Sequence, residues 1–228
     1  MKPIVIAQNH GVETPGLIAA ALEKKGVEYK IVRTFDRKPL PRPREVRAAI
    51  VLGTPVSVRD YLQHDYLRRL FEFMAETVRF NIPLLGICFG GQMLAHVMGA
   101  RVEPNEQKEI GIFKARLTEA GASDPLFAGF EREFEVFQWH GDTFRIPHGA
   151  TSLVEGTTCK NQAFRKGRAV AIQFHVEPTA DEIPLWCDAY ADELTSEKLT
   201  RETIVSEFNQ RREYLEQLSF RLVENFLK

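Results

Sequence analysis

A cysteine with a glycine two residues away on each side stands between an apolar run and a helical pattern, in residues 84–94. The run Leu-Leu-Gly-Ile is typical of a buried strand, and the residues after the cysteine favour a helix. A side chain at such a sharp turn crowds the backbone two positions away, and glycines at Gly86 and Gly90 relieve the crowding. The pattern therefore predicts a nucleophile elbow, in which the amides of the helix N-terminus favour the Cys88 thiolate and lower its pKa.

The N-terminal half of the chain alternates strand-like and helix-like stretches around this turn. Strands are expected at residues 4–7, 29–32, 48–52 and 83–87, and helices at 16–25, 66–80 and 91–98. Such alternation is typical of a doubly wound sheet with helices on both faces. We therefore expect an α/β fold with a mainly parallel sheet.

The C-terminal half changes to strand patterns followed by helical ones. Strands are expected at residues 110–117, 134–139, 152–155, 162–165 and 169–175, in a more antiparallel region. From Asp181 onward the pattern is helical, and residues 204–227 carry apolar side chains near one face. We expect residues 1–190 to form one domain and residues 191–228 to be a helical extension packed on it. A helix that binds a partner or forms a dimer is the alternative.

Composition and charge narrow the classes of partner. The chain has 228 residues, and 30 basic against 31 acidic side chains give a net charge of −1. Such a balance creates no global field for nucleic acid or an acidic membrane surface. The apolar run at residues 4–7 is too short for a signal peptide or a membrane span. Three widely spaced cysteines fit neither a disulfide framework nor a paired-cysteine zinc site. We expect a cytoplasmic protein with no nucleic-acid or membrane partner.

A thiolate that attacks an amide needs a base to take and return a proton, so a histidine should reach Cys88 in space. His175 ends the apolar strand at 169–175, and Glu177 follows two residues later. Alternation along a strand places both side chains on one face, where the carboxylate would orient the imidazole. His140 is a weaker alternative, because His175 is the histidine followed by the glutamate of the His-x-Glu strand end. The remaining histidines show no metal-ligand spacing, so no metal site is expected: His10, His64, His96 and His148.

The motif Gly-x-Cys-x-Gly-x-Gln at residues 86–92, followed by Gln-Phe-His-x-Glu at residues 173–177, resembles the class I glutamine amidotransferase signature. The similarity covers about residues 1–190 and includes the loop at 52–55 and the run Phe-Gln-Trp-His-Gly-Asp-Thr-Phe at 137–144. It points to the single-domain members related to the amidotransferase part of GMP synthase. The resemblance implies a flavodoxin-like fold with added antiparallel strands and C-terminal helices.

The resemblance also assigns roles to individual residues. Cys88 would be the nucleophile, His175 the general base and acid, and Glu177 the group that orients the imidazole. The backbone N–H groups of Thr54 and Phe89 would form the oxyanion hole. The expected contacts to the rest of the substrate are Gly53, Gln92, Trp139, Gly141 and Asp142.

Two positions depart from the family pattern. Thr54 stands where the family commonly has a second glycine, and a β-branched residue tolerates fewer backbone angles. The oxyanion hole is therefore expected to need a partner or a ligand to form. Val176 stands where the family often has proline, and we expect no consequence because its side chain points to the other face.

The implied chemistry is hydrolysis of L-glutamine to glutamate and ammonia through a γ-glutamyl thioester on Cys88. No phosphate-binding or dinucleotide-binding glycine loop occurs in the sequence, and no cofactor is expected. The chain is too short to hold a synthase domain as well, so a separate synthase or acceptor subunit would use the ammonia. A homodimer is a second possible assembly. Two alternatives remain: a γ-glutamyl peptide hydrolase with the same triad, and a non-catalytic regulatory relative.

Overall fold

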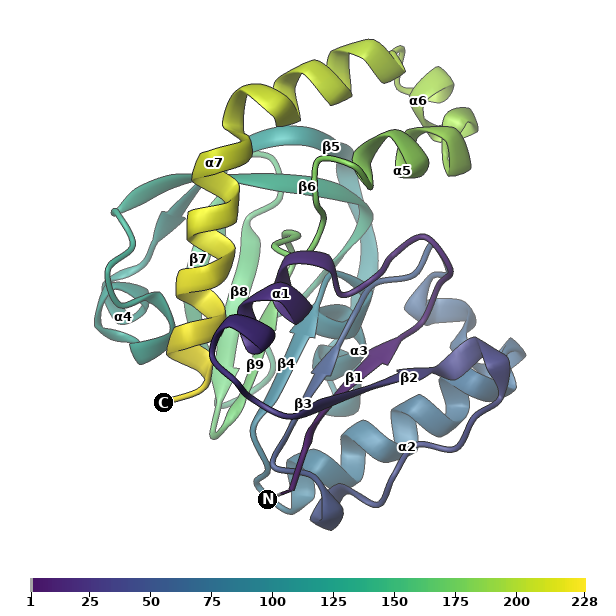
Figure 1. Ribbon diagram of the computed structural model, residues 1–228, viewed down its shortest axis with the longest axis vertical. Helices are drawn as coiled ribbons and strands as arrows, with labels where there is room; N and C mark the ends of the chain where they lie inside the picture. Colours follow the sequence, from purple (N-terminus) through teal and green to yellow (C-terminus); the bar gives the residue numbers. More distant parts are fainter. Residues whose placement is uncertain (1) are drawn as a thin grey trace.

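The computed structural model describes residues 2–228, in which nine strands form one sheet in the order β2-β1-β3-β4-β9-β8-β7-β5-β6 (Figure 1). The parallel part consists of β1 (Ile4–Gln8), β2 (Tyr29–Arg33), β3 (Ala48–Val51), β4 (Leu84–Ile87) and β9 (Ala169–Ile172). The antiparallel part consists of β5 (Val102–Leu117), β6 (Glu133–Phe144), β7 (Thr151–Gly156) and β8 (Asn161–Lys166). The expected α/β fold with an added antiparallel region is confirmed.

Helices cover both faces of the parallel part. On one face α1 (Gly16–Lys24) and the C-terminal α7 (Arg201–Phe226) pack in one core with the strands. On the other face α2 (Asp65–Arg79) and α3 (Phe89–Val97) enclose a second core. Because strand side chains alternate between faces, a parallel strand buried on both sides reads as the continuous apolar run seen in the sequence. The shorter helices are α4 (Glu119–Ser123), α5 (Ile183–Ala189) and α6 (Ala191–Ser196), and the 3-10 turns are η1 (Thr34–Asp36), η2 (Pro43–Glu45), η3 (Val58–Gln63) and η4 (Pro125–Phe127).

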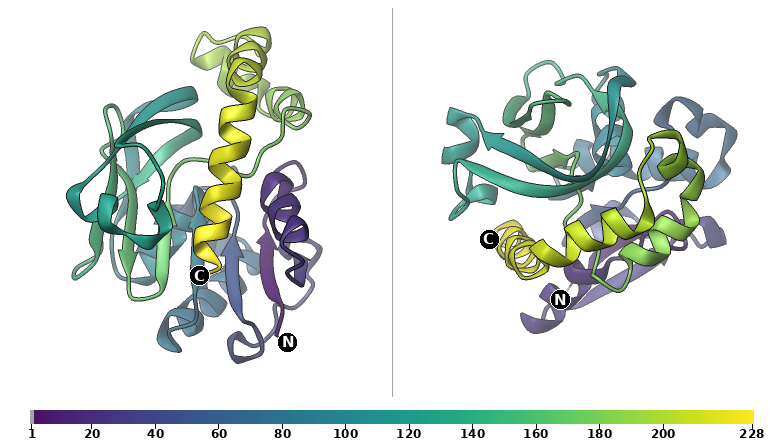
Figure 2. Two further views of the ribbon diagram at one scale, coloured as in Figure 1. Left: turned by 60° about the vertical axis from the view of Figure 1, so that its left-hand side comes forward. Right: turned by 90° about the horizontal axis from the view of Figure 1, so that it is seen from above.

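The antiparallel strands curve back toward the parallel part. Although β6 is the last strand of the sheet order, its residue Phe137 forms an isolated antiparallel bridge with His175, just beyond the end of β9. The long ribbons of β5 and β6 show this curvature in Figure 1 and in the view from above in Figure 2. The curvature brings the middle of β6 to the carboxyl end of β4, where Cys88 lies.

Several element boundaries differ from those expected, and β6, for example, ends at Phe144 rather than at residue 139. β5 begins at Val102 rather than at residue 110, because backbone pairing with β6 continues through a polar segment that a hydrophobic pattern does not reveal. β9 ends at Ile172 rather than at 175, because the N–H of His175 donates to Phe137 O at 2.9 Å instead of continuing the ladder. α3 begins at Phe89 rather than at Gly91, because the Gln92 N–H already donates to Cys88 O.

α7 lies along the molecule and contacts both parts of it (Figure 2). Its N-terminal half packs against α5 through Ile204 and Phe208, and its C-terminal half packs against α1 through Leu218 and Leu222. The apolar face expected for residues 204–227 is therefore covered by the rest of the chain. The proposed division of the chain at residue 190 stays a prediction.

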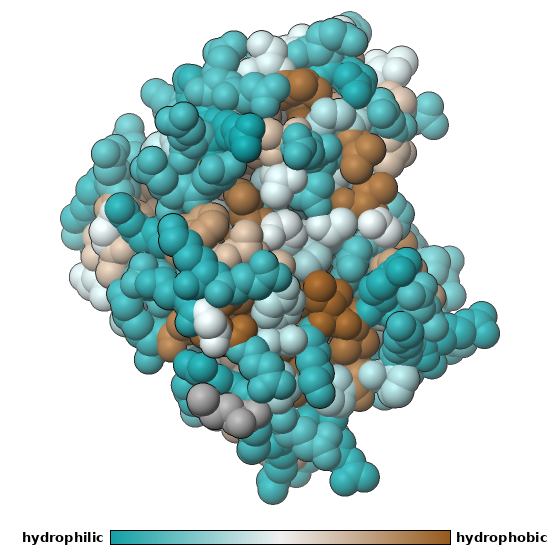
Figure 3. Space-filling view, in the orientation of Figure 1, coloured by the Kyte–Doolittle hydropathy of each residue, from teal (hydrophilic) through white to brown (hydrophobic). Residues whose placement is uncertain are grey.

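The surface shown in Figure 3 is mostly hydrophilic, with small groups of hydrophobic residues between the polar ones. The large hydrophobic side chains that are exposed are Ile31, Leu62, Leu185 and Tyr214. Within residues 2–228, every helix is too short or too polar to cross a bilayer.

Candidate active site

Cys88 occupies the turn between β4 and α3 in a backbone conformation that is unusual for a residue with a side chain. Its φ is 51° and its ψ is −111°, and its N–H donates to Ile172 O at 2.9 Å. Non-glycine residues in such conformations cost on the order of 1–3 kcal/mol and persist where the surrounding structure holds them. The turn places the Cys88 thiol at the carboxyl edge of the parallel strands.

Gly86 and Gly90 allow the backbone to close around this turn. A Cβ on Gly86 would overlap the carbonyl of Gly90 and lie 2.8 Å from Gly91 N. A Cβ on Gly90 would overlap the carbonyl oxygen of Val51, in the neighbouring β3, and lie 2.8 Å from the carbonyl carbon. The expected crowding across the turn is confirmed for Gly86, whereas Gly90 is required by the close packing of α3 on β3.

His175 and Glu177 form a buried hydrogen-bonded pair in the segment after β9. His175 Nδ1 lies 2.6 Å from Glu177 Oε1, and the two side chains are 1% and 0% exposed. The edge of Trp186 covers the imidazole, with the ring centroids 4.9 Å apart. Within residues 2–228, the second ring nitrogen of His175, Nε2, is enclosed and lacks a hydrogen-bond partner. The pair can therefore hold one imidazole nitrogen in place and leave the other free for proton transfer.

Cys88 and His175 lie close enough for their charges to interact, although their resting geometry falls short of a hydrogen bond. Burial raises the pKa of the Cys88 thiol, and the imidazolium opposes this only in part. Burial lowers the pKa of His175, but Glu177 and the Cys88 thiolate together outweigh it and raise this pKa well above its usual value. The expectation of a lowered Cys88 pKa is therefore wrong, because desolvation of the thiolate outweighs its favourable contacts.

The two residues expected to supply the oxyanion hole line the same cavity as Cys88. Phe89 is the first residue of α3, where helix N–H groups lack intrahelical partners, and Thr54 follows β3 in a buried loop. Thr54 is not among the non-glycine residues with positive φ, so its β-branched side chain imposes no left-handed strain on the loop. The expectation that Val176 has no consequence is wrong, because its N–H donates to Glu177 Oε2 at 3.0 Å. A proline would lack this donor.

The wall opposite the elbow is the segment of β6 that includes residues 139–142. Trp139 O lies 3.8 Å from Cys88 Sγ, and Gln92 Nε2 donates to Asp142 O at 2.9 Å. The Asp142 carboxylate accepts from Ser57 Oγ at 2.6 Å and pairs with Arg59 at 3.2 Å. Gln92 therefore ties β6 to α3 and fixes the distance between the thiol and this wall.

A cavity of 640 Å³ opens in front of Cys88. Most of the residues predicted from the sequence line it: Thr54, Cys88, Phe89, Gln92, Trp139, Gly141, Asp142 and His175. Glu177 lies behind His175, and Gly53 lies behind the carboxylate of Glu13. The structure thus brings the predicted residues together around one cavity.

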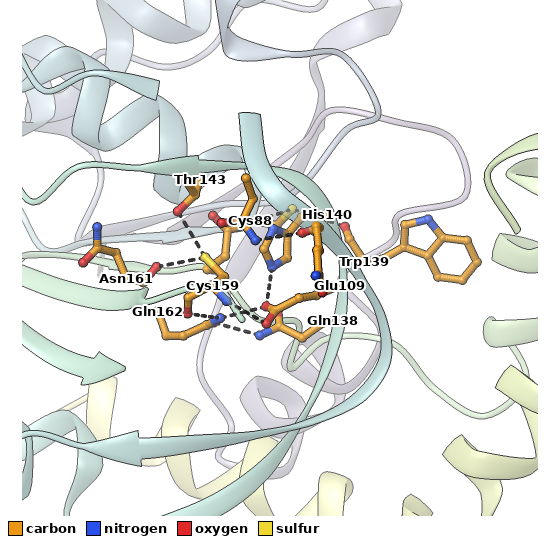
Figure 4. Close-up of polar contacts among 12 residues, drawn as sticks. Cys88, Glu109, Gln138, Trp139, His140, Thr143, Cys159, Asn161 and Gln162 are labelled. Carbon is orange, nitrogen blue, oxygen red and sulfur yellow. Dashed lines mark hydrogen bonds and ion pairs between the residues drawn. The ribbon is translucent and has the colours of Figure 1, made fainter. Parts of the chain in front are cut away.

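A buried polar network lies behind the 139–142 segment (Figure 4). Glu109 Oε2 accepts from His140 Nε2 and from Gln162 Nε2, both at 2.9 Å, and Glu109 Oε1 accepts from the Cys159 N–H at 3.0 Å. His140 Nδ1 lies 2.9 Å from Asp142 O. Both ring nitrogens of His140 are therefore occupied inside the protein, which argues against His140 as the base for Cys88.

The same network contains three side chains of metal-binding type. One ligand atom each from Glu109, His140 and Cys159 lies within 4.8 Å of the others. Sequence spacing could not reveal this cluster, because its members come from β5, β6 and the loop before β8. The protein already satisfies both Glu109 oxygens and the His140 nitrogens, so the arrangement fits a structural hydrogen-bond network.

Sequence reasoning also missed other residues of the cavity wall, among them Glu13, Trp186 and Tyr190. Glu13 lies in the loop after β1 and is 4% exposed, and Tyr190 Oη donates to its Oε1 at 2.7 Å. Burial raises the pKa of Glu13 to about 7, although the nearby His175 opposes the shift. No local motif identifies these residues, because Glu13 comes from the loop after β1, whereas Trp186 and Tyr190 come from α5 and its C-terminal end.

Known proteins resemble most of the chain. The family profile described as Glutamine amidotransferase class-I matches residues 8–183. A glutamine-hydrolyzing GMP synthase from Cytophaga hutchinsonii is 36% identical over 182 residues, which are 78% of this chain and 34% of that protein. The glutamine amidotransferase-like protein YfeJ of Salmonella typhimurium is 30% identical over 176 residues, which are 75% of this chain and 74% of that protein.

A solved structure extends the likeness to the C-terminal helices. The crystal structure of a glutamine amidotransferase from Thermotoga maritima matches with a TM-score of 0.91 at 30% identity, over 100% of this chain and 99% of that one. The chain spans about a third of the length of the GMP synthase that it matches.

Proposed function

The chain belongs to the class I glutamine amidotransferase family, and we propose that it hydrolyses the side-chain amide of L-glutamine through a thioester on Cys88. The observation that carries the proposal is the buried His175–Glu177 pair. Glu177 holds His175 Nδ1, while His175 Nε2, near the Cys88 thiol, has no hydrogen-bond partner within residues 2–228. A nucleophile, a base and a group that orients the base are the parts that acyl transfer requires.

The first half of the reaction forms the thioester. The Cys88 proton passes to His175 Nε2 as the sulfur attacks the side-chain carbonyl carbon of glutamine. The backbone N–H groups of Phe89 and Thr54 stabilise the negative oxygen of the tetrahedral intermediate. When the intermediate collapses, the carbon–nitrogen bond breaks and His175 gives its proton to the nitrogen, which leaves as ammonia.

The second half releases glutamate. A water molecule loses its proton to His175 and attacks the thioester carbonyl. The carbon–sulfur bond then breaks, and the proton returns from His175 to the sulfur. Glu177 stabilises the imidazolium that forms in each half. The raised pKa of His175 has the same cause, since a neighbouring carboxylate favours the charged ring.

A second candidate is hydrolysis of γ-glutamyl peptides by the same residues. The cavity of 640 Å³ favours it, because this volume lies in the range for ligands much larger than glutamine. Glu193 of α6 and Glu197, just after this helix, also line the cavity. A substrate with a larger leaving group would extend into this space.

The ammonia acceptor is a further proposal. Because the relatives include a GMP synthase of which this chain matches about a third, we propose that a separate synthase or acceptor subunit receives the ammonia. A homodimer is the other assembly that we propose to test, and light scattering of the purified protein would distinguish it from a monomer.

The test is release of ammonia and glutamate from L-glutamine by the wild-type protein, Cys88→Ala and Cys187→Ala. Cys187 is buried in α5 outside the cavity lining, so its variant is a matched control. We expect Cys88→Ala to lose on the order of 10³-fold or more in kcat and Cys187→Ala to keep wild-type activity. Release that persists in Cys88→Ala would overturn the proposal. Faster turnover of γ-glutamyl peptides than of glutamine would favour the second candidate, and ordinary thiol reactivity without turnover would indicate a regulatory relative.

A further inference from the structure

Glu13 presents an unpartnered oxygen to the cavity. Its side chain is 4% exposed, and its Oε1 accepts from Tyr190 Oη at 2.7 Å. Within residues 2–228, no donor reaches Oε2, although Glu13 lines the cavity. Tyr190 is itself held by a contact of 3.0 Å with His10 Nδ1. Glu13 Oε2 therefore faces the cavity, where a bound ligand can supply the donor.

The free oxygen lies beside the imidazole of His175. A Cβ on Gly53 would overlap Glu13 Oε2 and lie 3.4 Å from His175 Cε1. Gly53 therefore leaves room for the Glu13 carboxylate, and the side chains of Glu13 and His175 both pack against the backbone of Gly53. The carbon Cε1 is bonded to Nε2, the nitrogen that serves Cys88 in the proposed function. Glu13 therefore lies close to the imidazole that must give a proton to the leaving group.

The 139–142 segment lines another part of the cavity wall. There, Gln92 holds the carbonyl of Asp142, and the carbonyl of Trp139 faces the thiol. Proton transfer requires the leaving nitrogen to lie within hydrogen-bond reach of His175 Nε2, about 2.6–3.2 Å. The leaving nitrogen must therefore lie close to His175, the residue beside which Glu13 is found.

We propose that Glu13 Oε2 accepts a hydrogen bond from the leaving nitrogen of the substrate amide and so forms a subsite for the departing ammonia or amine. This inference rests on the proposed function of Cys88 and His175. The Glu13 carboxylate neither gives nor takes a proton in the step: the sulfur–carbon bond forms, the carbon–nitrogen bond breaks, and His175 supplies the proton. The hydrogen bond orients the nitrogen lone pair toward His175 and grows stronger as the nitrogen becomes positive.

The charge on Glu13 decides how well this subsite works. The titratable groups that face it are His10 from its own loop, His175 and Glu177 from the segment after β9, Tyr190 and Glu193 from the C-terminal helices, Tyr66 from α2, and Cys88 from the elbow. Since burial raises the pKa of Glu13 to about 7, its ionised fraction increases between pH 6 and 8. Amide hydrolysis should increase with it.

The test compares an amide with an ester of the same acyl group. Wild type, Glu13→Gln and Glu119→Gln are assayed with L-glutamine and with L-glutamate γ-methyl ester, whose leaving oxygen carries no hydrogen. Glutamine at position 13 keeps the size of the side chain and removes its charge, and Glu119 is an exposed residue paired with Arg132. Thermal unfolding and alkylation of Cys88 verify that each variant is folded with an intact elbow.

We expect kcat/KM for glutamine at pH 8 to fall about 10- to 100-fold in Glu13→Gln, with the ester changed by less than about threefold. The rise in amide activity between pH 6 and 8 should flatten in this variant, and Glu119→Gln should behave as wild type. Equal losses on both substrates, or no loss on the amide, would overturn the Glu13 subsite while leaving Cys88 chemistry intact. A wild type that hydrolyses neither substrate would overturn the proposed function, and the subsite with it.

Discussion

Glu13 carries a carboxyl group whose pKa burial raises to about 7, against an ordinary value of 4.5. The folded protein therefore resists ionising a group that the unfolded chain ionises freely. Below pH 4.5 the group is protonated in both states and costs nothing. The cost grows between pH 4.5 and 7 and is constant above, so this residue makes the fold less stable as the pH rises.

Removal of this charge should stabilise the protein at high pH. We expect Glu13→Gln to increase the free energy of unfolding by up to roughly 3 kcal/mol at pH 8 and by much less at pH 5. Urea denaturation of the variant and the wild type at both pH values measures the difference. An equal effect at the two pH values would mean that the Glu13 carboxyl has an ordinary pKa in the folded state.

The sequence could identify the residues that belong to a short motif with a recognisable spacing. Cys88 was found between its two glycines, and His175 and Glu177 were found two residues apart. Glu13 could not be found, because its place beside His175 depends on loops after β1 and β3 that meet only in the fold. The direction of the Cys88 pKa was also beyond the sequence, because it depends on how deeply the thiol is buried.

At the scale of elements, the turn from β4 to α3 depends on how closely the helix can approach the sheet. Gly90 is the contact point, since a Cβ there would overlap the carbonyl oxygen of Val51 in β3. The neighbour is backbone, which cannot move aside as a flexible side chain would. The elbow therefore requires a glycine at a position that lies outside the turn itself.

A methyl group at this point should push α3 away from β3. We expect Gly90→Ala to lower the free energy of unfolding by about 1–3 kcal/mol or more, and to reduce turnover because Cys88 moves with the helix. Gly11→Ala is the matched control, since nothing lies within 4 Å of a Cβ at that exposed position, and it should change stability by less than about 0.5 kcal/mol. Thermal unfolding compares the variants. A Gly90→Ala protein as stable as the control would contradict this account of the elbow.

The elements of the parallel part were more predictable than those of the antiparallel part. Strands such as β3 and β4 are buried on both faces, so their apolar runs stand out in the sequence. The first half of β5 is polar and gains its regularity from backbone pairing with β6, which leaves no hydrophobic pattern to read. The bridge between Phe137 and His175 likewise joins backbone groups that have no signature in the side chains.

At the scale of the whole molecule, the site forms where the two parts of the sheet and the C-terminal helices meet. The parallel part supplies Cys88, the curved β6 supplies Trp139, and α5 supplies Trp186, which covers His175. Trp186 is anchored in turn by donating to Val12 O at 2.9 Å. The C-terminal helices are therefore part of the cavity wall, and the helical pattern alone did not reveal this role.

The central claim is that Cys88 carries a γ-glutamyl thioester during hydrolysis of glutamine. Rapid acid quenching of the wild type mixed with L-glutamine, followed by mass spectrometry of the peptide that contains Cys88, tests it most directly. The account predicts a γ-glutamyl adduct on Cys88 that appears with ammonia release and is absent, together with that release, in Cys88→Ala. Ammonia release that continues in Cys88→Ala, with Cys88 unmodified in the wild type at every quench time, would contradict it.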